Sequence, residues 1–385
     1  MIEKYYNGVI EQVAGGIGNV EHNSILVRYS NDFSIWDLES VNHYKDQTDI
    51  FFTCHEFSYN KIAEAYEPYL GLIRQMFHKY CSGTLEEFME ECDVYKLQRP
   101  VFESYFEKGF CERTEQILID EVEYEQERMR NSIVTMLQKL SEIRPVVIVL
   151  NRFQLASKST MQLSNSLLQV KNKNIGIVLG VNDVQSIPEF AHEEWDAICE
   201  SMDDRNMVYH IGNAGRNMEP DVMDYYSDYE SDDGYRKLNN LVYFLDFDQA
   251  NHHLSKIERR IKFDNFTISE KKHYQLLLLQ IMVSVLQRDI AKALESCEDL
   301  EKLQDQEKEG AFYYNFWMAT SYMYLGKLEE AMIYVQKAKE CGEALGDDFL
   351  VFRAELLKAQ NQMSGWCNIF FCAQDIEISD KLIEK

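Results

Sequence analysis

A run of five apolar residues, Val146–Leu150, constrains most strongly how this chain can fold. The run follows Pro145 and ends at a polar pair, Asn151 and Arg152. A short, unbroken and largely β-branched run is typical of a strand buried on both faces, in a parallel sheet covered by helices. Ligands of such sheets bind outside the carboxyl ends of the strands. We therefore expect any site in this part of the chain to lie near Asn151 and Arg152.

Four other short apolar runs predict further strands, at residues 24–29, 49–54, 174–181 and 207–211. Helical patterns precede and separate these strands, at residues 3–14, 33–44 (capped by Ser30–Asp32), 60–80, 84–92, 115–140 and 193–202, and a further helix is expected to open at residues 157–159. Alternating strands and helices are typical of βαβ units. Residues 1–212 are thus predicted to form a three-layer α/β domain with a mostly parallel, five-stranded sheet. The interval between the second and third strands is too long for one crossover helix, so a helical insertion is expected there.

The composition changes after residue 212. Residues 213–237 are rich in Asp and Tyr and show little periodicity, which predicts a solvated acidic linker. A calcium loop is the alternative interpretation. However, Asp228, Glu230, Asp232 and Gly234 do not fit the register that an EF-hand loop requires.

Residues 238–385 read as amphipathic helices with an internal repeat. The segment 314–339 best matches a tetratricopeptide helix pair, with Ala319, Tyr322, Gly326, Ala331 and Ala338 at the expected offsets. Related helix starts carry Ala250, Ala293, Ala331 and Ala373. A tetratricopeptide-like solenoid is predicted, and an irregular helical bundle is the alternative. Such repeats bind a protein or peptide on their concave face, and the candidate contact residues are Tyr314, Trp317 and Tyr322. The last helical pattern has no capping repeat, so we expect a fragment of a longer protein or a partner that caps it.

Charge and cysteine usage exclude several classes of function. The net charge of −26 argues against a nucleic-acid surface. No apolar stretch is long enough to span a membrane, and the first residues do not resemble a signal peptide. The nine cysteines are scattered, without a C-x-x-C pair. That pattern predicts reduced thiols in a cytoplasmic protein and neither a disulfide framework nor a metal site.

The sequence has no glycine-rich, lysine-containing loop at the position where a phosphate loop would bind a nucleotide. Gly15, Gly16 and Gly18 precede the first strand and are not followed by Lys-Ser/Thr. The loop after that strand contains Tyr29, Ser30, Asn31 and Asp32, without glycine or lysine. Asp32 would repel a phosphate, and the side chains crowd the space that phosphates require.

Taken together, residues 1–212 and the helical part that follows resemble the signal-transduction ATPases with numerous domains (STAND), a class of P-loop ATPases related to AAA proteins. The segment 66–70 is similar to the start of the helix after strand two in that family, and residues 144–156 and 174–183 to its third and fourth strands. The resemblance implies a P-loop-NTPase-like fold. It also implies two acidic residues at the end of the third strand, where this chain has Asn151 and Arg152, and an Arg-containing motif after the fourth, where it has Asn182.

These departures predict a degenerate ATPase domain that hydrolyses no ATP and holds no metal. The Asn151 amide is neutral and so would not offset the charge of a Mg²⁺ ion, and the positive charge of Arg152 would repel the ion. His55 and Glu56 end the second strand, but adjacent strand residues point to opposite faces, and no nucleophile accompanies them. The first hypothesis is therefore a non-hydrolysing interaction module of a bacterial signalling protein, without a cofactor. The alternative is a divergent switch that binds ATP and Mg²⁺, the sensory part of a longer protein with a cyclase or DNA-binding output. The sequence leaves the oligomeric state open.

Overall fold

The computed structural model describes residues 2–18, 23–30, 34–45, 49–58, 61–111, 122–170, 172–182, 187–203, 207–211, 231–263 and 267–364. The chain divides into two compact units, Met1–Gln249 and Ala250–Lys385. Each unit has its own hydrophobic core and is described separately below.

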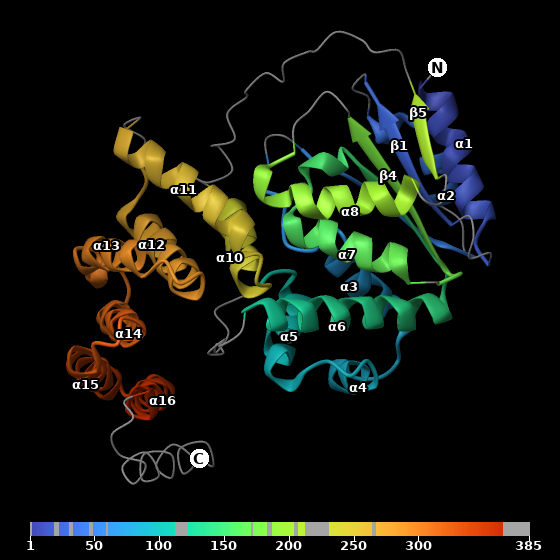
Figure 1. The fold of residues 1–385 in the computed structure, drawn as a ribbon. Helices are drawn as coiled ribbons and strands as arrows, with labels where there is room; N and C mark the ends of the chain where they lie inside the picture. The colour runs from blue at the N-terminus through green and yellow to red at the C-terminus, as the bar shows by residue number, and fades with distance from the viewer. Residues whose placement is uncertain are drawn as a thin grey trace. The chain divides into compact units, whose positions relative to one another are not determined.

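The first unit is built on a five-stranded sheet in which all strands run parallel (Figure 1). The strand order is β2-β3-β4-β1-β5. The strands are β1 (Ser24–Tyr29), β2 (Phe51–Glu56), β3 (Val146–Asn151), β4 (Ile175–Asn182) and β5 (Val208–Ile211). Every residue of β3 and β4 is buried, as the unbroken apolar runs predicted. The predicted α/β fold class is confirmed.

Helices cover both faces of this sheet (Figure 1). One face is covered by α1 (Ile2–Gly15) and α2 (Glu39–Lys45). Tyr6, Val9 and Val13 of α1 belong to one buried cluster with Val147 and Val178 of the sheet. The helices on the other face are α3 (Tyr69–Tyr80), α6 (Val122–Ile143), α7 (Lys158–Gln169) and α8 (His192–Asp203).

The helical insertion expected between the second and third strands is present. It contains α3, α4 (Leu85–Glu91), α5 (Arg99–Lys108) and α6. Thr84 caps α4, because its hydroxyl accepts from the amide of Glu87 while the Glu87 carboxylate accepts from the amide of Thr84. This reciprocal pair fixes the start of α4 where the sequence predicted a helix.

Two predicted helices were wrong in part. The helix expected at 33–44 is broken into a 3-10 turn, η1 (Ile35–Asp37), and α2. The Glu56 carboxylate holds this turn by accepting from the Ile35 amide, and the backbone of Leu38 is extended. The helix expected at 60–80 begins only at Tyr69. Pro68 explains the late start, because a residue before proline is disfavoured in the helical region.

The border between the units falls after Gln249, not after residue 237 as predicted. Helix α10 (Asp232–Tyr243) belongs to the first unit. Asn240 of α10 accepts from the amide of Cys111 at 2.7 Å, and Phe244 packs on Tyr66 and Phe102. These tertiary contacts outweigh the change in composition on which the predicted border rested. Residues 213–230 of the predicted linker lie outside the described residues.

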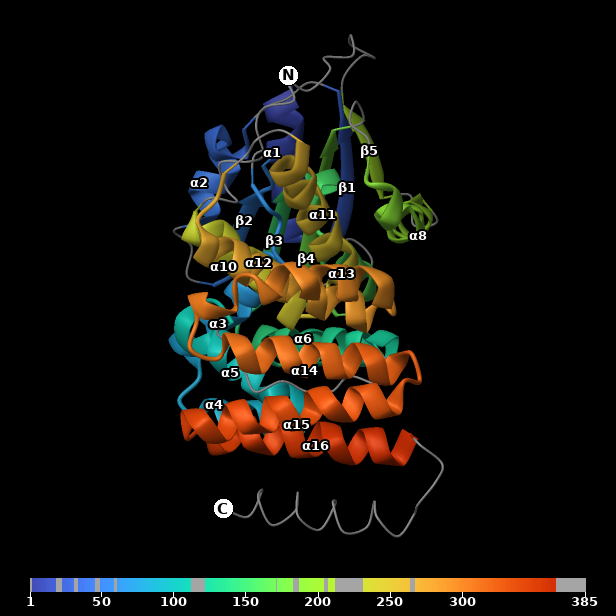
Figure 2. The same ribbon diagram turned by 90° about the vertical axis from the view of Figure 1, so that its left-hand side faces the viewer.

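The second unit is a stack of helices, as predicted (Figure 2). It comprises most of α11 (Phe247–Phe263), then α12 (Glu270–Leu286), α13 (Ile290–Glu301), α14 (Gly310–Tyr324), α15 (Leu328–Leu345) and α16 (Asp348–Ser364). Ala319, Ala331 and Ala338 are fully buried, which allows α14 and α15 to pack closely. Gly326 forms the turn between them with φ of 71°.

The repeat also appears in the turns between helices. Leu245, Arg288 and Gly326 all adopt the left-handed conformation. Each stands two residues before a helix, namely α11, α13 and α15. In each of these helices the fourth residue is a fully buried alanine, at 250, 293 and 331. The predicted alanine spacing thus marks equivalent positions, while Ala373 lies outside the described residues.

Candidate functional site at the carboxyl edge of the sheet

The strand order places a switch point between β1 and β4. The chain leaves β1 toward β2 on one side and leaves β4 toward β5 on the other. Open α/β sheets bind ligands outside the carboxyl ends of their strands at such a point. Tyr29 ends β1, Asn182 ends β4 opposite it, and Asn151 ends the neighbouring β3. The sheet therefore brings these three predicted positions to one edge.

The side chains of Tyr29 and Asn151 form a buried hydrogen bond with each other. The Tyr29 hydroxyl donates to Oδ1 of Asn151 at 2.8 Å, and both side chains are buried. The Asn151 Nδ2 atom has no hydrogen-bond partner among the described residues. A buried amide that is only half satisfied opposes folding, so this residue type is not explained by stability alone.

Tyr6 of α1 fills the space beside this pair. A Cβ atom on Gly180 would collide with the Tyr6 hydroxyl and would lie only 2.7 Å from Oδ1 of Asn151. Position 180 therefore has to be glycine. Burial, followed by the proximity of Tyr29, raises the pKa of Tyr6 well above its ordinary value, so the phenol stays neutral. Sequence reasoning did not identify Tyr6, because its apolar spacing on α1 is that of a core residue.

Arg152 and Glu56 form an ion pair across the ends of β3 and β2. Nη1 of Arg152 lies 3.0 Å from Oε1 of Glu56. The other Glu56 oxygen accepts from the Ser34 hydroxyl and the Ile35 amide, both at 3.2 Å. Arg152 itself has φ of 54°, a left-handed conformation that is strained for a residue with a side chain. Both oxygens of the Glu56 carboxylate are thus engaged by the protein.

The remaining predicted positions lie nearby or outside the described residues. Asn182 is buried, and its amide donates to Oε1 of the buried Gln154 at 3.2 Å. Ser30 follows β1 and is half-buried. Asn31 and Asp32 lie outside the described residues.

These residues do not fit a Mg²⁺-nucleotide. Mg²⁺ prefers carboxylate oxygens and nucleotide phosphates as ligands. The Glu56 carboxylate is paired with Arg152, and the Asn151 oxygen accepts from Tyr29. Binding a metal here would require breaking both interactions beside a guanidinium group.

A second polar cluster lies on the opposite side of β2. His55 and Glu56 point to different faces, as predicted, and Nε2 of His55 lies 3.5 Å from Oε1 of Glu67. Burial, with a smaller contribution from Lys61, lowers the pKa of His55 to about 4. Its imidazole is therefore neutral near pH 7, so the contact with Glu67 is not an ion pair.

Glu64 is the other half-buried acidic residue of this cluster. Burial and the neighbouring Glu67 raise the pKa of Glu64 to about 7. Its Oε2 atom accepts from Nδ2 of Asn240 on α10 at 2.8 Å. The Glu64 amide donates to Glu67 at 3.1 Å, which fixes the loop before α3. Sequence reasoning missed Glu64, because its partner on α10 is 176 residues away.

This second cluster contains groups that could exchange a proton. A neutral imidazole and an acid titrating near pH 7 could pass a proton. The contacts of Glu64 and Glu67 are to the loop, to α10 and to His55, which is the pattern of a structural network. Among the described residues, no group of three His, Cys, Asp or Glu side chains could hold a metal ion.

The predicted partner-binding residues all lie on α14 of the second unit. Trp317 packs into the core and is 9% exposed, which leaves little of its ring for a partner. Tyr322 is half-buried and stacks on Tyr334, with centroids 5.5 Å apart. Tyr314 meets the same Tyr334 ring edge-on. Partner binding by Tyr314 and Tyr322 stays a prediction.

No helix in the described part of the chain is both long and apolar enough to cross a membrane. No protein-family model matches the sequence, and no curated protein matches it. Among solved structures, the chain is similar to the crystal structure of a STAND protein with a tetratricopeptide repeat sensor from Pyrococcus horikoshii. The two are 13% identical, with a TM-score of 0.38, and the match covers 94% of this chain and 69% of that one.

Proposed function

We propose that the chain is a regulatory interaction module of a signalling protein whose α/β unit no longer hydrolyses a nucleotide. The observation that carries the proposal is the occupation of the carboxyl edge by the protein's own side chains. Tyr29 binds Asn151, and Arg152 neutralises Glu56, where a hydrolase would need carboxylates for a metal. In this proposal the helical repeats bind a protein or peptide, because stacked helix pairs offer an extended surface.

A divergent ATP-binding switch is the second candidate. The switch point between β1 and β4 favours it, since the fold keeps the place where α/β sheets bind ligands. In that case, nucleotide would be held without hydrolysis by residues other than those of a standard phosphate loop. Arg152, which directly follows β3, would then be the cation that contacts the phosphates.

Titration with a fluorescent ATP analogue separates the two candidates. The purified chain is titrated with and without Mg²⁺ while fluorescence anisotropy is recorded. The proposal expects no saturable binding tighter than about 100 µM, or roughly 5–6 kcal/mol. The matched variant R152A removes the ion pair with Glu56. Tight binding by the wild type that R152A abolishes would establish the switch instead.

The interaction role needs a separate test. Peptides are selected by phage display on the immobilised full chain, and their affinities are measured by anisotropy. We expect the double variant Y314A/Y322A to weaken the selected peptides at least tenfold, about 1.4 kcal/mol. Y5A, which removes a 61% exposed tyrosine of the first unit, is the matched control. Equal affinities for all three proteins would refute binding through these residues.

A further inference from the structure

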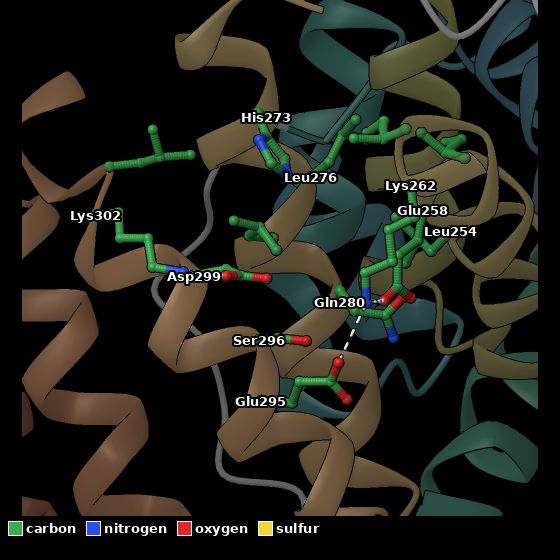
Figure 3. Close-up of a pocket in the computed structure, with 14 residues that line it drawn as sticks. Leu254, Glu258, Lys262, His273, Leu276, Gln280, Glu295, Ser296, Asp299 and Lys302 are labelled. Carbon is green, nitrogen blue, oxygen red and sulfur yellow. Dashed lines mark hydrogen bonds and ion pairs between the residues drawn. The ribbon is translucent and has the colours of Figure 1, made fainter. Parts of the chain in front are cut away.

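The second unit contains a pocket that no predicted role accounts for. It lies between α11, α12 and α13 and has a volume of about 300 Å³ (Figure 3). Apolar pockets of roughly half that volume accommodate a benzene ring, and sites for small organic ligands begin at about this size. The pocket therefore has room for a ring with a short side chain.

The inner wall of the pocket is apolar and buried. Ile257 of α11 and Leu276 and Leu277 of α12 are each less than a tenth exposed. Leu254, Ile261 and Leu303 complete the apolar lining. Such a surface gains free energy when it is covered by another apolar group, at about 25 cal/mol per Å². The wall thus selects for a ligand with an apolar body.

Gln280 adds an unsatisfied acceptor to this lining. Gln280 lines the pocket and is only 4% exposed. Nε2 donates to the Ser284 hydroxyl at 3.1 Å and lies 3.5 Å from Oδ1 of Asn251. Oε1 has no hydrogen-bond partner among the described residues. A buried acceptor of this kind favours a ligand that brings a hydrogen-bond donor.

The charges of the lining favour a cation. Glu258, Glu295 and Asp299 supply three carboxylates, while Lys262 and Lys302 supply two ammonium groups. Lys262 lies 2.7 Å from Glu258 and 3.1 Å from Glu295, and Lys302 lies 2.7 Å from Asp299. Among the described residues, His273 is the only other titratable group that lines the pocket. Burial lowers its pKa, so it is neutral near pH 7. The three carboxylates outnumber the two ammonium groups, so the lining carries one excess negative charge near pH 7.

We propose that this pocket binds a small organic monocation, an ammonium group on an apolar aromatic or alkyl body. The apolar body lies against Leu276 and Leu277. Turning of the Gln280 amide, whose Oε1 atom is covered in this structure, brings Oε1 to the ammonium group, and the ammonium group also faces the carboxylate of Glu258 or Glu295. An anionic ligand is disfavoured by the same carboxylates, and a neutral one leaves the excess charge in place. The site is independent of the nucleotide and peptide questions above.

Three isosteric probes test the choice of ligand. Phenethylammonium, 2-phenylethanol and phenylacetate share a ring and differ in head-group charge. Binding to the full chain is measured by isothermal titration calorimetry at pH 7. We expect phenethylammonium to bind at least tenfold more tightly than the other two. Equal binding of the three probes, tighter binding of phenylacetate, or no binding of phenethylammonium would overturn the proposal.

Variants of the lining test the site. Q280L removes the acceptor and is expected to weaken phenethylammonium about tenfold, whereas Q280E keeps an acceptor, adds charge and should retain or tighten binding. E295Q removes the excess charge and should also weaken binding several-fold. E330Q changes an exposed acid on α15 and is the matched control. Circular dichroism shows whether each variant is folded. Unchanged affinity in folded Q280L and E295Q would refute the site.

Discussion

At the scale of single residues, the hydroxyl of Tyr29 decides how the carboxyl edge of the sheet is closed. It satisfies Oδ1 of Asn151 at 2.8 Å in a fully buried position. Y29F keeps the ring but leaves this acceptor unpaired, so we expect a loss of about 1–3 kcal/mol in the free energy of unfolding. Urea denaturation measures it. Y5F, at an exposed tyrosine, is the control. A Y29F protein as stable as Y5F would show that the hydrogen bond contributes nothing.

Glu64 gives the stability of the first unit a pH dependence. Its pKa is raised from 4.5 to about 7, so folding opposes ionisation of this carboxyl group. The sign follows directly: the wild type is unaffected below pH 4.5, and it loses stability as the pH rises from about 4.5 to 7. E64Q does not ionise. We therefore expect E64Q to gain on the order of 2 kcal/mol relative to wild type between pH 4.5 and pH 7.

Urea midpoints at several pH values test this expectation. E11Q, which removes an exposed acid of α1, reports the general effect of one charge. The prediction fails if the stability difference between E64Q and wild type is the same at pH 4.5 and pH 7. It also fails if E11Q shows the same trend as E64Q.

At the scale of elements, the turns of the second unit require a left-handed residue. At position 326 this residue is a glycine, whereas at the two equivalent positions it is Leu245 or Arg288, whose side chains make the left-handed conformation less favourable. No atom lies within 4 Å of a Cβ built on Gly326, so only the backbone conformation opposes a substitution. We expect G326A to destabilise the second unit by about 1–2 kcal/mol.

The matched substitution G8A should have the opposite sign. Gly8 lies within α1, and its Cβ would also meet open space. Alanine is favoured over glycine inside a helix by about 1 kcal/mol. Thermal unfolding of both variants tests the pair. Destabilisation by G8A, or an unchanged stability of G326A, would show that local backbone preference is not the controlling term.

At the scale of the whole molecule, the net charge of −26 is the dominant electrostatic fact. Such a charge opposes the compact state by self-repulsion. Raising the NaCl concentration from 10 to 150 mM shortens the screening length from about 30 to about 8 Å. We expect this change to stabilise the protein, on the order of 1 kcal/mol, since it weakens many small repulsions.

Urea denaturation at both salt concentrations measures the effect. KCl at equal concentration is the control for ion-specific binding, and it should give the same result. A lower stability at 150 mM salt would mean that attractive ion pairs, such as the one between Arg152 and Glu56, outweigh the repulsion.

The sequence was sufficient to predict the elements that depend on neighbouring residues. The bounds of β1 agree with the predicted strand at 24–29, and β3 begins at Val146 as expected. The helices predicted to start at Thr84 and at Ser157 are α4 and α7, and these two residues are their caps. The helical repeat followed from alanine spacing. These features could be predicted because periodicity and capping act over a few residues.

Contacts between distant residues could not be predicted in this way. The hydrogen bond from Tyr29 to Asn151 joins residues 122 positions apart, and Asn240 reaches back to Glu64. The predicted helix at 33–44 is interrupted where Glu56, at the end of β2, accepts a hydrogen bond from the Ile35 amide. The pocket between α11, α12 and α13 likewise depends on how three amphipathic helices meet.

The sequence by itself thus determined which segments form the sheet and the repeats, and that Asn151 and Arg152 stand at the end of β3 without acids. Only the tertiary structure decided what those residues contact. Tyr6 and Tyr29 close around Asn151, and Glu56 neutralises Arg152. The physical reason is that hydrogen bonding, burial and charge compensation act through space, between residues whose separation along the chain carries no pattern.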